Sequence, residues 1–135
     1  MYDKDIKFII DSGASQNLVI DSYEKYMSNI EYLQTKIKIY VANGQCLFSN
    51  KKGILNLKCN NIPIKLEALL VKGLSHNLLS VKKLLEKGNS VRFHKNFVSI
   101  TKGYNIIYGT MLNNLYAINL TLNLEKYLIH TDISG

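Results

Sequence analysis

The sequence is poor in the residues that mark several classes of protein. Among 135 residues it has two cysteines, one proline, one arginine and no tryptophan. Cys46 and Cys59 form no CxxC pair and have no pair of histidines near them, so we predict no metal site, no cofactor and two reduced thiols. With one proline and no low-complexity tract, the composition favours a single domain with a core of its own.

Long apolar runs are also absent. No stretch approaches the roughly 18 residues that a membrane-spanning helix requires. The apolar stretch Ile6-Ile10 is too short for a signal peptide and ends in Asp11. We therefore expect an intracellular, cytoplasmic protein that does not enter a membrane.

Charge is the main bias in the composition. The net charge is +7, and all but one of the seventeen basic residues are lysines. Arginine, the better reader of phosphates and bases, is nearly absent. The nine tyrosines show no stripe-like spacing with the lysines, so we expect them to fill a core and not to stack on bases. A solvated basic surface is favoured, and loose association with RNA inside a particle is the alternative.

Most of the remaining pattern predicts β-strands. Ile6-Ile10 is typical of a buried strand, and residues 36-42 alternate between apolar and polar before the turn pair Asn43-Gly44. A further extended segment covers 45-58, with a bend or bulge expected at Gly53. After a turn at Asn60-Asn61, more strands are predicted at 62-71, 91-93, 97-101, 105-108 and 115-120.

Helical pattern is limited to two short stretches. Ser80 stands as an N-cap before Val81-Lys87, and Gly88 follows the last turn. Asp21 and Glu24 have the spacing of a capping box, which predicts a short turn through Met27. Beyond residue 120 the alternation is lost, and leucines up to Leu128 predict either a short helix or a linker.

One tripeptide carries the chemistry. The apolar run before it delivers a carboxylate, a hydroxyl and a glycine in succession, as Asp11-Ser12-Gly13. Such tripeptides are usually turns, because Asp and Ser cap their own backbone and glycine accepts positive φ. A buried strand that ends in Asp-Ser/Thr-Gly is also how aspartic proteases present a catalytic carboxylate. Ser12 has no nucleophile-elbow motif around it, so a serine hydrolase is not favoured.

An ordered set of segments decides between these interpretations. The chain resembles retropepsins, the half-size aspartic proteases, and most closely the copia-type proteases of long-terminal-repeat retrotransposon Pol polyproteins. The resemblance covers about residues 6–120 and is carried by Ile9-Ile10-Asp11-Ser12-Gly13-Ala14-Ser15, Val41-Ala42-Asn43-Gly44, Ala68-Leu69-Leu70-Val71, Asn77-Leu78-Leu79-Ser80-Val81 with Leu84-Leu85 and Gly88, and Leu115-Tyr116-Ala117-Ile118.

The resemblance implies a fold and a reaction. The fold would be an all-β closed barrel of the retropepsin-like acid-protease type over residues 1–120, with one short helix near residues 81–87 and a tail or linker at 121–135. The activity would be that of an aspartic endopeptidase that cleaves a Gag-Pol-type polyprotein in a virus-like particle. Each chain of a homodimer would supply one of two carboxylates that share a proton.

The resemblance also assigns roles to individual residues. Asp11 would be catalytic. Support of the active site would fall to Ser12, Gly13, Leu79 and Ser80. Contact with the polypeptide substrate would come from Ala14, Ser15, Ala42, Asn43 and Gly44, the last three lying in a flap hairpin that closes over substrate.

Two departures from the family pattern lead to further expectations. Only ten residues precede Asp11, whereas viral retropepsins have an N-terminal strand there that joins the dimer. We therefore expect the hairpin around Tyr108-Tyr116 to contribute to dimerisation. The flap has one glycine, Gly44, in place of a glycine-rich tip, which predicts a stiffer or shorter flap, or one that orders only with substrate.

Two other functions remain open at this point. The chain could be a catalytically inactive, monomeric β-barrel module that acts in binding or particle assembly, because an Asp-Ser-Gly triplet can persist without a partner carboxylate. It could also be a basic domain that associates with RNA.

Overall fold

The computed structural model describes residues 4–124, which form one ten-stranded sheet and two short helices. The elements in chain order are β1 (Asp5–Asp11), β2 (Leu18–Ile20), the 3-10 helix η1 (Asp21–Tyr26), β3 (Met27–Tyr40), β4 (Cys46–Cys59), β5 (Ile62–Val71), β6 (Asn77–Ser80), α1 (Val81–Glu86), β7 (Ser90–Phe93), β8 (Phe97–Lys102), β9 (Asn105–Leu112) and β10 (Leu115–Leu122).

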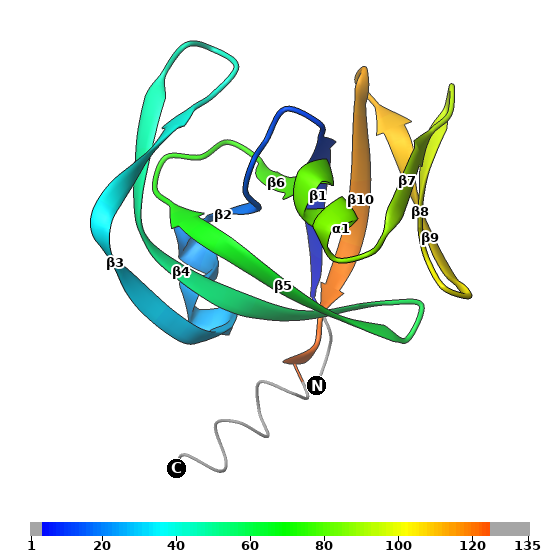
Figure 1. Cartoon of the computed structure of the whole chain (residues 1–135), viewed down its shortest axis with the longest axis horizontal. Helices are drawn as coiled ribbons and strands as arrows, with labels where there is room; N and C mark the ends of the chain where they lie inside the picture. The colour runs from blue at the N-terminus through cyan, green and yellow to red at the C-terminus, as the bar shows by residue number, and fades with distance from the viewer. Residues whose placement is uncertain (1–3, 125–135) are drawn as a thin grey trace.

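Six of the strands close into a barrel (Figure 1). The ring runs β4-β5-β2-β6-β1-β10 and returns to β4, where Thr121 and Leu122 pair with Lys58 and Leu57. Outside the ring, β3 pairs with β4, and β9, β8 and β7 extend the sheet from β10. The predicted all-β closed barrel with one short α-helix near residues 81–87 is confirmed.

Two hydrophobic cores hold the barrel together. The larger core fills the ring, and Ile6, Phe8 and Ile10 of β1 point into it because alternate residues of a strand share a face. The smaller core lies beneath the β3–β4 hairpin and contains Leu18, Ile39, Leu47, Leu69, Val71 and Leu74. The hairpin is therefore anchored on its inner face.

Asparagine pairs make two of the tight turns. Asn60 and Asn61 have φ of 51° and 64°, and they join β4 to β5 in a two-residue hairpin, as the sequence predicts. Asn113 and Asn114 do the same between β9 and β10, with φ of 52° and 65°. Both turns have the positive φ that asparagine tolerates better than other non-glycine residues.

The flap-like hairpin differs in detail from the expectation. Its first strand begins at Met27 and not at residue 36, because β3 has two irregularities that hide its alternation. The loop between β3 and β4 covers residues 41–45, and within it only Gly44 has a positive φ, at 83°. The bulge expected at Gly53 is confirmed in position, but the extra residue belongs to the opposite strand. Two residues of β3, Asn29 and Ile30, stand opposite Gly53, and Asn29 takes the positive φ of 55°, while the pairing of Gly53 with Ala68 of β5 is regular.

The predicted cap is confirmed for one of the two helices and wrong for the other. For α1 the prediction is confirmed, since the Ser80 hydroxyl accepts a hydrogen bond from Lys83 N and Gly88 has φ of 89°. The capping box at Asp21 is wrong. Ile20 takes the N-cap position of η1 and makes no side-chain cap, while Glu24 binds Lys51 of β4.

The end of the barrel lies slightly beyond residue 120. Thr121 and Leu122 belong to β10, and Leu122 is buried in the main core. A short helix through Leu128 was one expectation for the tail, and that part of the chain lies outside the described residues. Within residues 4–124 no helix is both long and apolar enough to span a bilayer.

Gly109 on β9 gives a test of the packing where the barrel meets the outer strands. A Cβ atom at this position would stand 2.5 Å from the Ala117 carbonyl oxygen and 2.8 Å from Val98 Cγ1. Because one of these neighbours is backbone, Gly109→Ala should lower the free energy of unfolding by about 1–3 kcal/mol. Urea denaturation would measure the change. The exposed neighbour Thr110 provides the control variant, Thr110→Ala, which should lose less than about 0.5 kcal/mol.

Candidate active site

Asp11 stands at the last position of β1, at one end of the barrel. β1 pairs in parallel with β6, so that Ile10 lies beside Leu79 and Asp11 beside Ser80. The carboxylate is half-buried, and its Oδ1 accepts a hydrogen bond from Gly13 N at 2.7 Å. A buried strand therefore ends in a carboxylate whose orientation is fixed by the turn that follows it.

In the turn after Asp11, the hydroxyl groups of Ser12 and Ser15 face solvent. Gly13 packs against the carboxylate, since a Cβ atom there would lie 3.3 Å from Asp11 Oδ1. Ser12 and Ser15 are exposed, whereas Ala14 is half-buried. Among the predicted site residues, Ser12, Gly13, Ala14 and Ser15 thus surround Asp11 in one loop.

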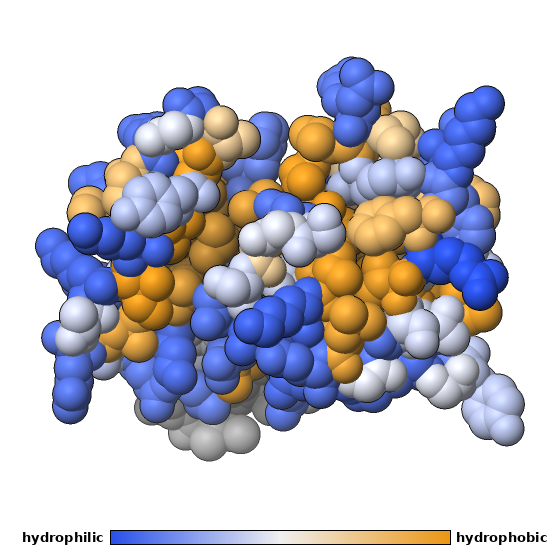
Figure 2. Space-filling view, turned by 45° about the horizontal axis from the view of Figure 1, so that its top comes forward, coloured by the Kyte–Doolittle hydropathy of each residue, from blue (hydrophilic) through white to orange (hydrophobic). Residues whose placement is uncertain are grey.

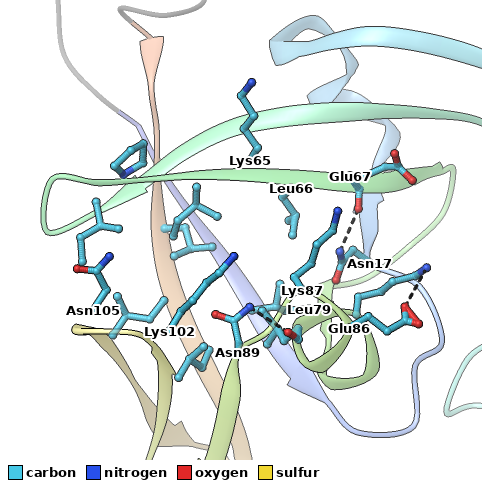
Figure 3. Close-up of a pocket in the computed structure, with 18 of the residues that line it drawn as sticks. Asn17, Lys65, Leu66, Glu67, Leu79, Glu86, Lys87, Asn89, Lys102 and Asn105 are labelled. Atoms are coloured by element: carbon cyan, nitrogen blue, oxygen red, sulfur yellow. Dashed lines mark hydrogen bonds and ion pairs between the residues drawn. The ribbon is translucent and has the colours of Figure 1, made fainter.

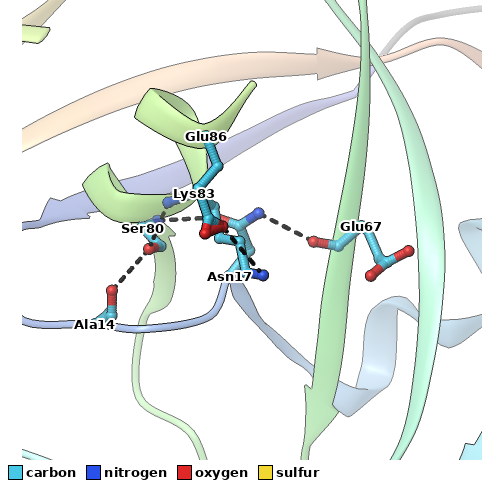
Figure 4. A network of polar contacts seen from close by, with 6 residues as sticks. All are labelled: Ala14, Asn17, Glu67, Ser80, Lys83 and Glu86. Atoms are coloured by element: carbon cyan, nitrogen blue, oxygen red, sulfur yellow. Dashed lines mark hydrogen bonds and ion pairs between the residues drawn. The ribbon is translucent and has the colours of Figure 1, made fainter. Parts of the chain in front are cut away.

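Ser80 ties this loop to the strand beneath it (Figure 4). The side chain is fully buried, and its Oγ donates a hydrogen bond to the Ala14 carbonyl at 2.7 Å. The same oxygen accepts from Lys83 N at 3.1 Å and so caps α1. One hydroxyl therefore satisfies both the loop and the helix, which a glycine or alanine at this position could not do.

Asn17 completes the connection at the other end of the loop. Its Oδ1 accepts a hydrogen bond from Ser80 N at 2.8 Å, and its Nδ2 donates to the Glu67 carbonyl at 3.0 Å. Its own carbonyl accepts from Leu69 N at 2.9 Å. The side chain is 6% exposed, so these bonds bind the loop to β5 and β6 without competition from water.

A second buried asparagine, Asn77 of β6, joins β1 and β2. Asn77 Oδ1 accepts from Ile20 N at 2.9 Å, and Asn77 Nδ2 donates to the Lys7 carbonyl at 3.3 Å. Neither Asn17 nor Asn77 was given a role by the sequence analysis. In the sequence, each asparagine stands directly before a buried apolar run, Leu18-Val19 in one case and Leu78-Leu79 in the other. This pattern indicates a buried amide that must be hydrogen-bonded.

The tip of the β3–β4 hairpin lies at the same end of the barrel as the Asp11 loop (Figure 1). Ala42, Asn43 and Gly44 are exposed there, and Asn43 Oδ1 accepts a hydrogen bond from Gln45 N at 2.8 Å. Figure 2 turns this end towards the viewer and shows apolar patches that are separated by polar residues. The hairpin tip therefore shares an end of the barrel with the carboxylate.

A groove of about 670 Å³ lies between α1, β5 and the β8–β9 hairpin (Figure 3). Its lining is mixed, because apolar side chains such as Leu66 share it with charged ones such as Lys87 and Lys102. Asp11 is not among the residues that line it, whereas Asn17 and Leu79 are. The groove therefore borders Asn17 and Leu79, which support the Asp11 loop, but it does not include the carboxylate itself.

Two neighbouring lysines of β4 form ion pairs away from the loop. Lys51 Nζ lies 3.0 Å from Glu24 Oε1, and this hydrogen bond raises the pKa of the lysine. Lys52 pairs with Glu31 at 3.3 Å. Burial raises the pKa of the Cys59 thiol, and both cysteines are free. In the part of the chain that the structure describes, no three His, Cys, Asp or Glu side chains gather as a metal site.

The geometry defines a class of protein, a closed β-barrel that presents one strand-end carboxylate beside a parallel partner strand. Residues 8–89, more than half of the chain, match the family described as the Pol polyprotein β-barrel domain. The chain belongs to this family and is a retrotransposon Pol polyprotein domain. No solved structure matches it.

The hydroxyl of Ser80 offers a test of how the loop is held. Ser80→Ala removes the donor to the Ala14 carbonyl and the acceptor for Lys83 N, and it leaves both groups without these partners. The free energy of unfolding should fall by about 1–3 kcal/mol. Amide exchange of residues 12–16 should also speed up. Ser15→Ala, at an exposed serine of the same loop, is the matched control and should change neither quantity.

Proposed function

We propose that this domain is an aspartic endopeptidase that works as a homodimer, with Asp11 of each copy forming the catalytic pair. The observation that carries the proposal is the way in which the fold positions the Asp11 carboxylate. The residue ends a buried strand, Gly13 N orients its carboxylate, and Ser80 and Asn17 fix the loop that follows. The membership of the Pol polyprotein family supports the same conclusion.

The reaction would proceed without a covalent intermediate. Two Asp11 carboxylates a few ångströms apart cannot both ionise easily, so they share one proton. The ionised carboxylate takes a proton from a water molecule, whose oxygen forms a bond to the peptide carbonyl carbon. The other carboxyl group donates a hydrogen bond to the carbonyl oxygen. The C–N bond then breaks, and a proton passes to the leaving nitrogen.

The surrounding residues would then divide the remaining tasks. Ser12 is exposed beside the carboxylate, where its hydroxyl can bond to the second copy. Ala14 and Ser15 would line the cleft. The exposed tip Ala42-Asn43-Gly44 would close over a bound polypeptide while the base of the hairpin stays packed on the smaller core. The substrate would be a Gag-Pol-type polyprotein, processed in the cytoplasm inside a virus-like particle.

The inactive binding module is the second candidate. The half-buried Asp11 and its neighbours would look the same in a monomer that never acquires a second carboxylate. A basic surface with a net charge of +7 would also suit such a module for loose contact with RNA. The two candidates differ in whether peptide-bond cleavage depends on Asp11.

Asp11→Asn is the decisive substitution. An amide cannot take a proton from water, and the homodimer would lose both carboxylates, so cleavage of a peptide library at pH 4–6 should fall by at least about 10³-fold. In the wild-type chain, the specific activity should rise with protein concentration. A statine-type peptide, whose hydroxyl replaces the attacking water, should inhibit it.

Asp21→Asn is the control for this substitution. Asp21 is an exposed aspartate of η1 that caps no helix, and its loss should leave cleavage unchanged. Cleavage that persists in Asp11→Asn would rule out the proposed mechanism. A wild-type sample that is demonstrably dimeric and still inert towards all peptides would favour the binding module.

A further inference from the structure

The outer face of β8, β9 and β10 is unusually apolar for a surface. Five large apolar side chains on it are between 39% and 59% exposed, namely Phe97, Ile106, Tyr108, Leu112 and Leu115. They belong to one face because the register sets Phe97 opposite Thr110, Ser99 opposite Tyr108 and Leu112 opposite Leu115. The rings of Phe97 and Tyr108 lie 6.1 Å apart, and His94 stacks on Phe97 at 4.0 Å.

This face continues directly to Asp11. β10 pairs with β1 so that Ala117 lies opposite Ile9, and residues two positions further along the two strands are Leu115 and Asp11. Because side chains alternate along a strand, Ile9 and Asp11 of β1 lie on the same face of the sheet as Ala117 and Leu115 of β10. The turn Asn113–Asn114 stands at the end of the barrel where the Asp11 loop lies (Figure 1). The apolar face and the carboxylate therefore form one surface.

The outer face of β8, β9 and β10 itself carries no charged side chain although the chain is strongly basic, and exposed Arg92 of β7 and Lys7 of β1 flank it. The outward positions of β8 are Phe97, Ser99 and Thr101, and those of β9 and β10 are likewise uncharged. Two copies of a chain with a net charge of +7 repel each other over most of their surfaces. A face without lysines is the side on which they can approach most closely.

We infer that the outer face of β8, β9 and β10 is the surface on which a second copy of this chain docks. The inference rests on the proposed function, because a dyad of Asp11 carboxylates is incomplete without that copy. A two-fold contact uses the same patch on both partners. With the axis near Asp11, Leu112 and Leu115 of each copy lie beside the axis, and Tyr108 and Phe97 extend the contact away from it.

The double substitution Leu112→Ser/Leu115→Ser tests the inference. Both positions are exposed in one chain, so the variant should unfold in urea at nearly the wild-type midpoint. It removes four leucines from the dimer, and the dissociation constant measured by sedimentation equilibrium should rise by about 100-fold. Peptide cleavage should fall at low protein concentration and recover as the concentration increases.

Leu85→Ser provides the matched control. Leu85 lies on α1, away from this face, and is 54% exposed, close to the 45% of Leu112 and Leu115. Its substitution should leave the dissociation constant unchanged. A wild-type chain that stays monomeric up to about 1 mM would overturn the inferred interface. An unaltered dissociation constant in the Leu112/Leu115 variant would overturn it as well.

The outcomes separate the interface from the activity. A dimer weakened by the leucine substitutions that nevertheless cleaves no peptide would support the interface and count against the protease. Cleavage that requires Asp11 but ignores the leucine substitutions at every concentration would support the protease and count against this interface.

Discussion

The parallel pairing of β1 with β6 is the constraint on which the rest of the structure depends. It joins segments about seventy residues apart and sets Asp11 beside Ser80. Parallel neighbours cannot be linked by a tight turn, so the chain must pass through β2 to β5 between them. That excursion builds most of the barrel. The carboxylate therefore has a rigid support only when the whole ring has closed.

The support itself is polar, which is costly inside a barrel unless every group finds a partner. Asn17, Asn77 and Ser80 are each at most 6% exposed, and their side chains bond to backbone groups of β1, β2, β5 and the Asp11 loop. Among the described residues, no buried side-chain nitrogen or oxygen lacks a hydrogen-bond partner. Backbone groups are fixed in space, so side chains that bond to them set the loop in one geometry. An apolar replacement would fill the volume but would not fix the loop.

The sequence predicts the elements whose pattern is local. Alternation identifies β5 to the residue, the Asn60–Asn61 turn follows from its residue types, and Ser80 with Gly88 marks the helix. The prediction fails where tertiary packing overrides the pattern. β3 begins at Met27 and not at residue 36, because the strand is irregular between Ser28 and Ile37. The bulge at Gly53 has its extra residue in β3, which the sequence of β4 does not indicate.

In the candidate site too, the sequence predicts the residues that belong to local motifs and misses those whose partners are distant along the chain. Asp11, Gly13 and Ser80 can be found from the sequence because each belongs to a short motif with a chemical reason. The roles of Asn17 and Asn77 cannot, because their partners are backbone groups some fifty to seventy residues away along the chain. An amide beside an apolar run says that the residue is buried and bonded, but not to which strand.

The distribution of surface character follows from the same arrangement. A sheet that closes on itself has a shared interior, yet β8 and β9 extend beyond the ring, so one of their faces has no layer to cover it. Sheets with an uncovered face normally place polar residues there. Here the uncovered face is apolar and reaches the one carboxylate that the fold presents at a strand end. The proposed homodimer requires both parts on the same side of each copy, so that the contact between the copies brings the two carboxylates together.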